Sequence, residues 1–374
     1  MKIAYLAHDL ADAASERRVA MLRRGGAEID LYGFRRAGGS PAEVAGVFPR
    51  ELGELRDGAM VQRATSLLRY GATAVDWAAP MADADLILAR NLDNLFLAAV
   101  ARRRLGLDIP LVYELLDIHT VMFGDGLAAR LMRAFEGRML QTTDAVITSS
   151  PAFEREYLAR YYRHRPPSLL VENKVGEGAA GEAPALSDGP PWRIGWFGGI
   201  RCRASLDCLS SLLKAHPGLF EVHIRGRFVT PRMGDVHAVI EETPGMYYHG
   251  PYQAAALPGI YGEVHFAWAI DFFQEGANSD WLLPNRLYEG GLHGAVPIAL
   301  RTVETGRWLQ QHGVGLLVDL PLEDSLRDLL TGITPQTYRA ASAALRGADR
   351  RLFEWADPDC KDLIVRLGAV RRRS

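Results

Sequence analysis

A short run around Arg286 combines residue types that bind phosphorylated nucleotides. It reads Leu-Pro-Asn-Arg-Leu-Tyr-Glu-Gly-Gly over residues 283–291. Because Pro284 suits the first turn of a helix, Arg286 and Glu289 should share one helical face near a positively polarised N-terminus. Arg286 can donate two charge-assisted hydrogen bonds to a diphosphate, and Glu289 can accept bonds from two ribose hydroxyls. The competing interpretation is a surface Arg–Glu pair. The glycines and the strand that follow favour the binding site.

A glycine turn is a further candidate for contact with an anion. Gly198 and Gly199 follow an apolar run, and Arg201 and Arg203 come directly after them. Two glycines allow a tight turn whose backbone approaches an anion, and either arginine can supply the counter-charge. Arg225, at the end of the next predicted strand, is a further candidate for contact with a nucleobase or diphosphate.

Titratable residues gather where a strand over 111–116 should end. Asp117 and His119 follow that strand, and Glu114 lies within it. Residues three apart on a strand face opposite ways, so at most one of the two carboxyls points to the same side as His119. A lone histidine is more often a structural residue, and that alternative stays open here.

These segments lie at strand ends in a chain that alternates strands with helices. Strands are expected at 2–8, 27–34, 84–89, 111–116, 145–149, 169–172, 193–197, 220–225, 264–270, 296–300 and 315–318, with helices between them, among others at 12–24, 60–77 and 152–162. Apolar strands separated by helices indicate the α/β class, with doubly wound parallel sheets covered on both faces. Ligands of such sheets bind outside the carboxyl ends of the strands.

Length and composition predict two domains. The chain has 374 residues, which is long for one ordinary domain. Residues 176–191 are rich in Gly, Ala and Pro without periodicity and indicate a linker. We therefore expect Rossmann-like domains at 1–175 and 192–351 that face each other across a cleft. A last helix, over about 352–374, should pack back on the first domain.

Charge and cysteine content exclude several classes of protein. A net charge of −2 argues against a dedicated nucleic-acid binder. Only four of the 43 basic residues are lysine, an excess of arginine that a GC-rich genome explains for the most part. Cys202, Cys208 and Cys360 fit neither a disulfide framework nor a zinc site, so buried free thiols are expected. The absence of a Gly-x-Gly-x-x-Gly motif after the first strand disfavours a nicotinamide dehydrogenase. With no signal peptide or membrane-spanning run, the chain is expected in the cytoplasm or at the inner face of a membrane.

Taken together, the motifs resemble the GT-B glycosyltransferases of family 4. There, as in 284–298 of this chain, a proline, a basic residue and a glutamate precede a glycine and a Val-Pro-Ile-like strand. The segments 195–201, 171–175 and 113–119 are similar to further elements of the family in the expected order. The His8-Asp9 start and the run 275–280 resemble bacterial exopolysaccharide transferases of the ExoL-like kind.

The resemblance implies a set of site residues and also shows two departures. The implied catalytic residues are His119, Asp117 and Glu275, and the implied donor-binding residues are Gly198, Gly199, Arg201, Arg203, Arg225, Asn278, Asn285, Arg286 and Glu289. Many members carry a second glutamate eight residues before the one at 289, where this chain has Trp281. Glu275, Asn278 or Asp280 can supply that contact instead. The usual glycine pair after the first strand is replaced by His8-Asp9-Leu10.

The same resemblance implies the reaction. A sugar would move from a UDP- or GDP-linked donor to a saccharide acceptor carried on an undecaprenyl-type lipid, in cell-surface polysaccharide synthesis. Retention of anomeric configuration without a metal or another cofactor is implied; if the reaction inverts, Asp117 is the candidate base. Two alternatives stay open: a sugar-nucleotide 2-epimerase of the same fold, and a degenerate transferase kept as a scaffold, which Trp281 motivates.

Clusters of basic residues raise the question of a membrane surface. They lie at 102–104, at 155–165 together with Tyr157, Tyr161 and Tyr162, and at 371–373. Such runs are usually solvated. In a transferase that acts on a lipid-linked sugar they could hold an anionic membrane, with the tyrosines at headgroup level.

Overall fold

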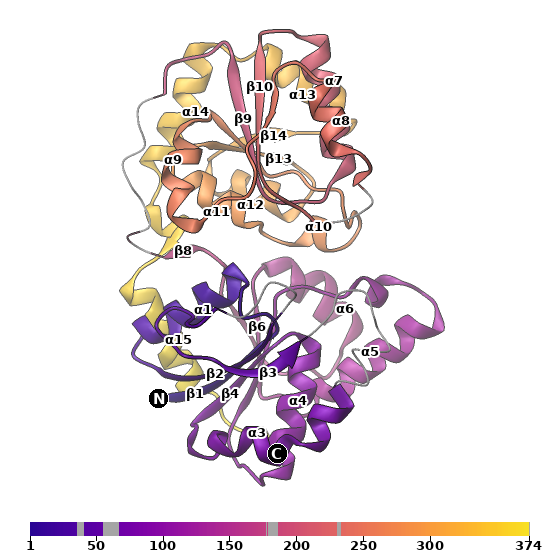
Figure 1. Ribbon diagram of the computed structural model, residues 1–374, viewed down its shortest axis with the longest axis vertical. Helices are drawn as coiled ribbons and strands as arrows, with labels where there is room; N and C mark the ends of the chain where they lie inside the picture. The colour runs from indigo at the N-terminus through magenta and orange to yellow at the C-terminus, as the bar shows by residue number, and fades with distance from the viewer. Residues whose placement is uncertain (36–40, 55–66, 177, 179–185, 230–232, 374) are drawn as a thin grey trace. The chain divides into compact units, whose positions relative to one another are not determined.

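The chain forms two units, each built on a parallel sheet. A computed structural model describes residues 1–374 except 36–40, 55–66, 177, 179–185, 230–232 and 374. The N-terminal unit comprises Met1–Asn173 with Ala356–Ser374, and the C-terminal unit comprises Lys174–Trp355. Helices cover both faces of each sheet in Figure 1. The predicted α/β class with doubly wound sheets is confirmed.

The N-terminal sheet is wholly parallel and has the order β3-β2-β1-β4-β5-β6-β7. Its strands are β1 (Lys2–Ala7), β2 (Glu28–Arg35), β3 (Arg50–Glu54), β4 (Leu86–Arg90), β5 (Leu111–Leu115), β6 (Ala145–Thr148) and β7 (Ser168–Leu170). The order reverses between β1 and β4. That point is where ligands usually bind in open α/β sheets.

The helices of this unit follow the predicted alternation. They are α1 (Ala13–Arg24), α3 (Ala74–Ala78), η1 (Ala79–Asp83), α4 (Asn91–Arg104), η2 (Thr120–Phe123), α5 (Leu127–Leu140), the π-helical turn η3 (Phe153–Leu158), α6 (Ala159–Tyr161) and α15 (Asp357–Gly368). Asp12 caps α1 by accepting a bond from the Ser15 N–H at 3.1 Å. Helix α15 packs on α1 closely enough that a Cβ at Gly25 would lie 2.4 Å from the Cys360 carbonyl oxygen.

Three features of this unit differ from the sequence-based expectations. Strand β3 lacks an apolar run and was not predicted. The predicted helix 152–162 is π-helical over most of its length. Of the predicted helix 60–77, residues 60–66 lie outside the described part, while 67–72 and α3 are helical.

The C-terminal sheet repeats the same pattern, with the order β11-β10-β9-β12-β13-β14 and a reversal between β9 and β12. Its strands are β9 (Trp192–Ile200), β10 (Phe220–Phe228), β11 (Met246–Tyr248), β12 (Phe266–Trp268), β13 (Val296–Leu300) and β14 (Leu316–Val318). The helices are α7 (Arg203–Ala215), α8 (Val236–Glu241), η5 (Ala254–Ala256), α9 (Leu257–Gly262), α10 (Asn278–Trp281), α11 (Asn285–Leu292), α12 (Glu304–His312), α13 (Leu322–Thr331), α14 (Pro335–Gly347) and η6 (Arg350–Leu352). Trp192, Trp196 and Trp268 are buried in its core, together with the thiols of Cys202 and Cys208.

The segment predicted as a linker is partly bound to the C-terminal unit. Strand β8 (Val175–Gly176) pairs with β15 (Glu354–Trp355), and residues 177 and 179–185 lie outside the described part. Beyond them, the Ser187 carbonyl accepts a bond from His265 Nε2 at 2.9 Å, while His265 Nδ1 accepts one from the Arg193 N–H at 2.9 Å. The end of the segment is therefore held by His265, which precedes β12 and is itself bonded to β9.

None of the helices among the described residues combines the length and the apolar character that a membrane span requires.

Candidate functional site

An ion pair joins two loops at the reversal point of the C-terminal sheet. Arg201 follows β9, and Asp271 follows β12, the neighbouring strand. The Arg201 Nε and Nη2 atoms donate to Asp271 Oδ2 at 3.1 and 2.8 Å. The Arg201 guanidinium also lies over the Phe273 ring, 5.2 Å from its centroid. Both contacts hold the guanidinium at the strand ends, where a ligand would bind.

Arg286, from the first turn of α11, adds a second positive charge to this point. Its Nη1 atom is buried and has no hydrogen-bond partner among the described residues. Burial lowers the pKa of Arg286; the Asp271 carboxylate opposes this shift, and the like charge of Arg201 adds to it. For the carboxyl of Asp271, burial acts in the opposite direction and would raise the pKa. The positive charges of Arg201 and Arg286 outweigh burial, so the pKa of Asp271 is lowered. Two guanidiniums therefore share one carboxylate, and the excess positive charge favours an anion.

The glycine turn beside this charge leaves its backbone open. Gly198 has a φ of 105°, and the atom nearest to an added Cβ would be the Tyr252 hydroxyl oxygen, 3.9 Å away. The paired strand β10 comes close on the other side, because a Cβ at Gly226 would lie 1.8 Å from the Gly198 carbonyl oxygen. Gly199 is exposed. An anion can approach such a turn closely.

Helix α11 forms where it was predicted, and it carries Arg286 and Glu289 as expected. Pro284 is the N-cap, one position before the first turn, and Asn285 is the first helical residue. Glu289 is buried and accepts a bond from the Tyr261 hydroxyl at 3.4 Å. Its carboxylate thus lies deeper than a surface ion pair would require, which argues against that alternative.

His293 is a buried polar residue that the sequence-based reasoning did not select. Neither ring nitrogen has a hydrogen-bond partner among the described residues, and the ring lies parallel to Tyr261, 22° apart in plane and 6.1 Å between centroids. Burial lowers the pKa of His293 despite the opposing charge of Glu289. The only sequence signal was its position directly after the Glu289 helix.

Asp271 was also missed as a site residue. Nothing in the local sequence links it to Arg201, because their contact depends on the adjacency of β9 and β12.

Arg203 and Arg225, two other predicted donor-binding residues, have protein partners in the structure. Arg203 donates to both Asp207 carboxylate oxygens at 2.8 and 3.0 Å and to the Met233 carbonyl at 2.7 Å. Of the two arginines considered as counter-charge, the structure therefore brings only Arg201 together with Asp271. Arg225 pairs with Glu263 at 3.0 Å, while its buried Nε has no partner within the described residues.

The polar residues of the segment 275–280 differ in their exposure and in their hydrogen-bond partners. Glu275 is exposed, whereas Asn278 is buried and donates to the Gln274 side chain at 2.5 Å. Asp280 accepts a bond from the Gly276 N–H at 3.1 Å. Burial, together with the nearby Glu275, raises the pKa of Asp280. The catalytic role of Glu275 and the donor-binding role of Asn278 stay predictions.

In the N-terminal unit, Asp117 and His119 are exposed beyond the end of β5. His119 Nδ1 accepts a bond from the Val121 N–H at 3.3 Å and so caps the short helix η2. Glu114 points into the interior instead. Of the two carboxyls that compete for a site role, only Asp117 is accessible.

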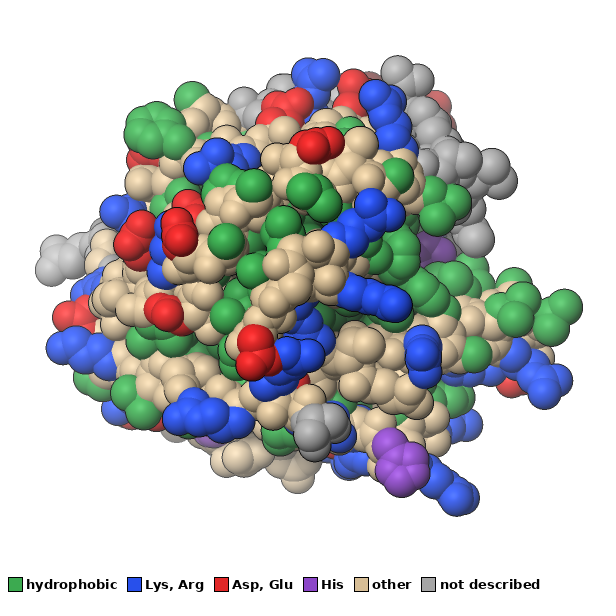
Figure 2. All heavy atoms as spheres, turned by 90° about the horizontal axis from the view of Figure 1, so that it is seen from below, with side chains coloured by type: hydrophobic (Ala, Val, Ile, Leu, Met, Phe, Trp, Pro, Cys, Tyr) green, Lys and Arg blue, Asp and Glu red, His purple; other side chains and the backbone are tan. Residues whose placement is uncertain are grey.

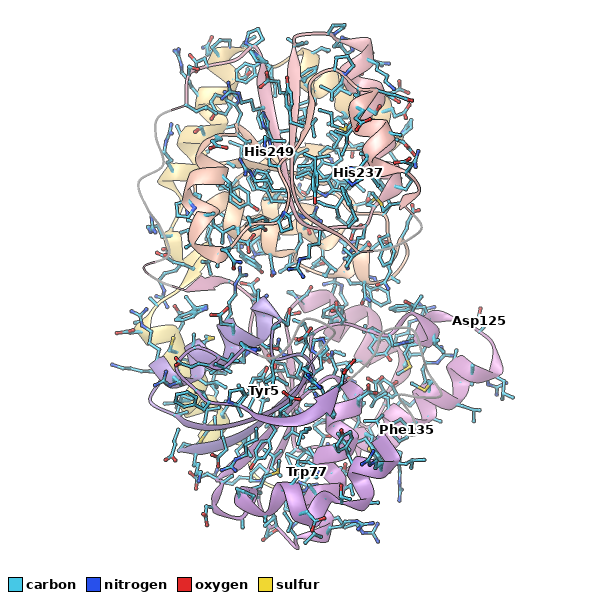
Figure 3. The ribbon with its side chains drawn as sticks, in the orientation of Figure 1. Tyr5, Trp77, Asp125, Phe135, His237 and His249 are labelled. Carbon is cyan, nitrogen blue, oxygen red and sulfur yellow. The ribbon has the colours of Figure 1, made fainter. Side chains whose placement is uncertain are left out.

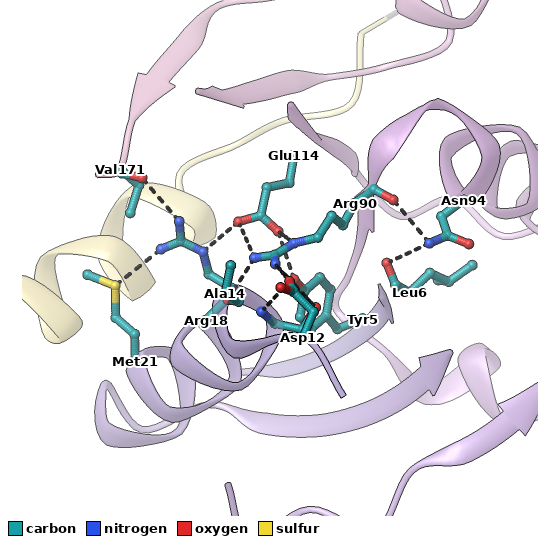
Figure 4. Close-up of polar contacts among 11 residues, drawn as sticks. Tyr5, Leu6, Asp12, Ala14, Arg18, Met21, Arg90, Asn94, Glu114 and Val171 are labelled. Carbon is teal, nitrogen blue, oxygen red and sulfur yellow. Dashed lines mark hydrogen bonds and ion pairs between the residues drawn. The ribbon is translucent and has the colours of Figure 1, made fainter. Parts of the chain in front are cut away.

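Glu114 is the centre of a buried charged cluster at the reversal point of the N-terminal sheet (Figure 4). Arg90 donates to its two oxygens at 2.9 and 3.1 Å, Arg18 donates at 2.6 Å, and the Tyr5 hydroxyl donates at 2.8 Å. Burial alone would raise the pKa of Glu114, but Arg90 and Arg18 outweigh it and lower the pKa to about 2. The cluster joins α1 and three strands, β1, β4 and β5.

Several residues of the basic clusters considered for a membrane have partners within the protein instead. Tyr157 and Tyr162 are buried and donate to Glu136, so the prediction that they reach headgroup level is wrong. Arg102 pairs with Asp144, and Arg372 pairs with Asp108. These arginines support the fold of the N-terminal unit. Among the described residues no three His, Cys, Asp or Glu side chains are grouped so that they could ligate a metal ion.

Comparison with known proteins identifies the family. The glycosyl transferase 4-like domain matches residues 11–173. The succinoglycan biosynthesis protein ExoL of Rhizobium meliloti is 39% identical over 378 residues, covering 99% of this chain and 94% of the relative. Two solved structures share the fold at low identity, with 98% of each chain covered. Sucrose-phosphate synthase from Thermosynechococcus elongatus has a TM-score of 0.75 and 14% identity, and Anabaena HepE in complex with UDP and glucose has a TM-score of 0.71 and 17% identity. The chain has two doubly wound sheets and is similar to ExoL over nearly its whole length. It therefore belongs to the ExoL-like glycosyltransferases of GT-B fold.

Proposed function

We propose that the C-terminal unit binds a UDP- or GDP-linked sugar and that the enzyme transfers this sugar to a saccharide during exopolysaccharide synthesis. The observation that carries the proposal is the buried Nη1 of Arg286, which lacks a partner among the described residues beside the Arg201–Asp271 pair. A diphosphate would supply the missing acceptor and balance the excess positive charge. The structural relative HepE, in complex with UDP and glucose, and the name of ExoL support the same donor class and pathway.

The remaining donor contacts follow from the surroundings of that charge. The open backbone at Gly198 and Gly199 approaches the diphosphate, and Glu289 accepts bonds from the ribose hydroxyls. Asn285 begins the helix that carries Arg286, and Asn278 begins α10, the helix before it. Both would contact the donor.

For the chemistry we propose retention of configuration without a metal ion. As the glycosidic bond breaks, negative charge develops on the leaving diphosphate, and Arg201 and Arg286 stabilise it. The leaving diphosphate itself then helps to deprotonate the acceptor hydroxyl, so no protein base is needed. His119, exposed beyond β5, contacts the donor sugar, and Asp117 would become the base only in an inverting reaction.

For the acceptor we propose a saccharide on an undecaprenyl-type lipid, which is bound by the N-terminal unit. The enzyme would then work in the cytoplasm, peripherally at the inner face of the membrane. The name of ExoL supports polysaccharide synthesis as the setting.

A thermal-shift screen across nucleotide sugars tests the donor class, because ligands that bind the native state raise its melting temperature. We expect one UDP- or GDP-sugar to stabilise the enzyme, and the same compound to label a lipid-linked saccharide fraction. A 2-epimerase would convert the free sugar nucleotide without an acceptor, and a scaffold would show no turnover at all. Either result would contradict the proposal.

A further inference from the structure

Helix α5 of the N-terminal unit exposes an apolar stripe. Leu127, Leu131 and Phe135 are spaced by four residues, and their side chains are 72%, 61% and 37% exposed. Residues at this spacing lie on one face of a helix. Figure 3 shows Asp125 at the outer edge of the unit, before the helix begins, and Phe135 further along it. An exposed stripe of large apolar side chains on one helix usually marks an interaction surface.

The opposite face of α5 is fixed in the unit by a buried carboxylate. Glu136 accepts bonds from the hydroxyls of Tyr113, Tyr157 and Tyr162 at 3.0, 2.5 and 2.5 Å. Ala129 and Leu140 are buried on the same side. Because Glu136 and Leu127 are nine positions apart, they lie half a turn from each other around the helix axis. The hydrogen bonds to Glu136 hold one face of α5 against the unit, and the apolar stripe on the other face is therefore directed outward.

Basic side chains lie along one side of this stripe. Arg130 and Arg138 are exposed on α5, and a groove of about 460 Å³ beside the helix is lined by Arg133, Arg138, Arg163 and His164. The guanidiniums of Arg133 and Arg160 lie over the Tyr161 ring, 4.9 and 5.5 Å from its centroid. The only acidic residue of α5 is the buried Glu136, and Asp125 precedes the helix.

The surface view shows the same mixture of side chains. On the right of Figure 2, where α5 lies in Figure 1, hydrophobic side chains project next to Lys and Arg side chains. This combination of an apolar stripe with a basic border is the pattern of a helix that lies in the interface of an anionic bilayer.

We propose that α5 and the adjacent groove dock the enzyme on an anionic lipid bilayer. Leu127, Leu131 and Phe135 enter the boundary between headgroups and acyl chains, while Arg138 and Arg163 bind lipid phosphates. The inference deepens the proposed function, on which it rests, by naming the surface that meets the membrane. It also replaces Tyr157 and Tyr162, which were first considered for this role and which bond to Glu136 in the interior.

Charge complementarity favours a bilayer over a second copy of the chain as the occupant. A second copy that paired through the same face would bring the arginines of both copies together. Anionic headgroups neutralise them, and each arginine near such a surface strengthens binding by about fivefold.

Co-sedimentation of the full chain with vesicles tests this inference. We expect binding to vesicles of equal parts phosphatidylcholine and phosphatidylglycerol, little binding to phosphatidylcholine alone, and weakening by salt. The double variant Leu127→Ser with Leu131→Ser should bind about tenfold more weakly or worse. Arg138→Gln with Arg163→Gln should bind about 25-fold more weakly.

Matched variants elsewhere on the surface serve as controls. Leu320 and Val365 are 56% and 70% exposed, and Leu320→Ser with Val365→Ser should bind vesicles as the unaltered chain does. Arg327→Gln with Arg346→Gln is the control for charge. Equal binding by the α5 variants and their controls would overturn the inference, as would a dimer that the leucine substitutions dissociate.

Calorimetry with UDP and GDP on the same variants separates the two proposals. Nucleotide binding should be unchanged in the α5 variants, because they leave the C-terminal unit untouched. Vesicle binding without nucleotide binding in the unaltered chain would leave the docking surface standing and contradict the proposed donor site.

Discussion

Arg201 and Asp271 are separated by seventy positions in the chain yet joined by two hydrogen bonds, of 3.1 and 2.8 Å. The pair bridges the ends of β9 and β12, where the strand order reverses. It leaves Arg286 as the charge without a full set of partners among the described residues. The pair therefore orients one guanidinium and keeps the other available for a ligand.

Two buried carboxylates of the N-terminal unit, Glu114 and Glu136, should differ in how much stability is lost with their charge. Glu114→Gln leaves Arg18 and Arg90 buried without their counter-charge and should cost about 3–5 kcal/mol of unfolding free energy. In Glu136→Gln the amide oxygen can still accept from the tyrosines, and burial already raises the pKa of Glu136, so the loss should stay below about 1.5 kcal/mol. Urea titration of both variants checks this; equal losses would contradict it.

Acid should unfold the N-terminal unit through Glu114. Its pKa is lowered from 4.5 to about 2, so its contribution is fully present above pH 4.5 and is lost as the pH falls towards 2. The shift corresponds to about 3 kcal/mol. The urea midpoint of the unaltered chain should therefore drop over this range, and that of Glu114→Gln should drop less. Parallel curves would show that Glu114 is not the titrating group.

Gly226 should tolerate no side chain. Its φ of 137° and the 1.8 Å approach of an added Cβ to the Gly198 carbonyl oxygen predict a loss above about 2 kcal/mol for Gly226→Ala. Gly218→Ala is the control, since its φ of 76° is strained but its surroundings are open, and it should cost about 1 kcal/mol. Tryptophan fluorescence during urea unfolding measures both. Similar losses would mean that the strand ends separate easily.

His119 and Asp117 should differ in their effect on transfer. In a retaining reaction His119→Ala should lower kcat by about 100-fold, whereas Asp117→Asn should change it less than about fivefold. His237, exposed on α8 in the C-terminal unit (Figure 3), provides the control substitution His237→Ala. A loss confined to Asp117→Asn, with an inverted product by NMR, would contradict retention.

Local sequence patterns were sufficient for most elements and for part of the site. Helix α1 begins after Asp12 and ends before Gly25, because helix capping and termination depend on nearby residues. Arg286 and Glu289 were placed correctly on one helix for the same reason. The resemblance to family 4 was confirmed by a relative that covers nearly the whole chain.

What the sequence did not reveal depends on contacts between distant segments. The partners Arg201–Asp271 and Glu114–Arg90 each require two strands to be adjacent, and no local pattern states that adjacency. Tyr157 and Tyr162 were assigned to the surface because they stand among arginines, but Glu136, from another helix, draws their hydroxyls inward. Strand β3 has no apolar run that would mark it.

The central claim is that a nucleoside diphosphate binds beside Arg286, and calorimetric titration of UDP and GDP tests it most directly. We predict that the unaltered chain and Arg327→Ala bind one of them equally well. Arg286→Ala should weaken that binding by about 10- to 100-fold, since hydrogen bonds to a charged group are lost. Undiminished binding by Arg286→Ala, or binding of neither nucleotide by the unaltered chain, would contradict the account.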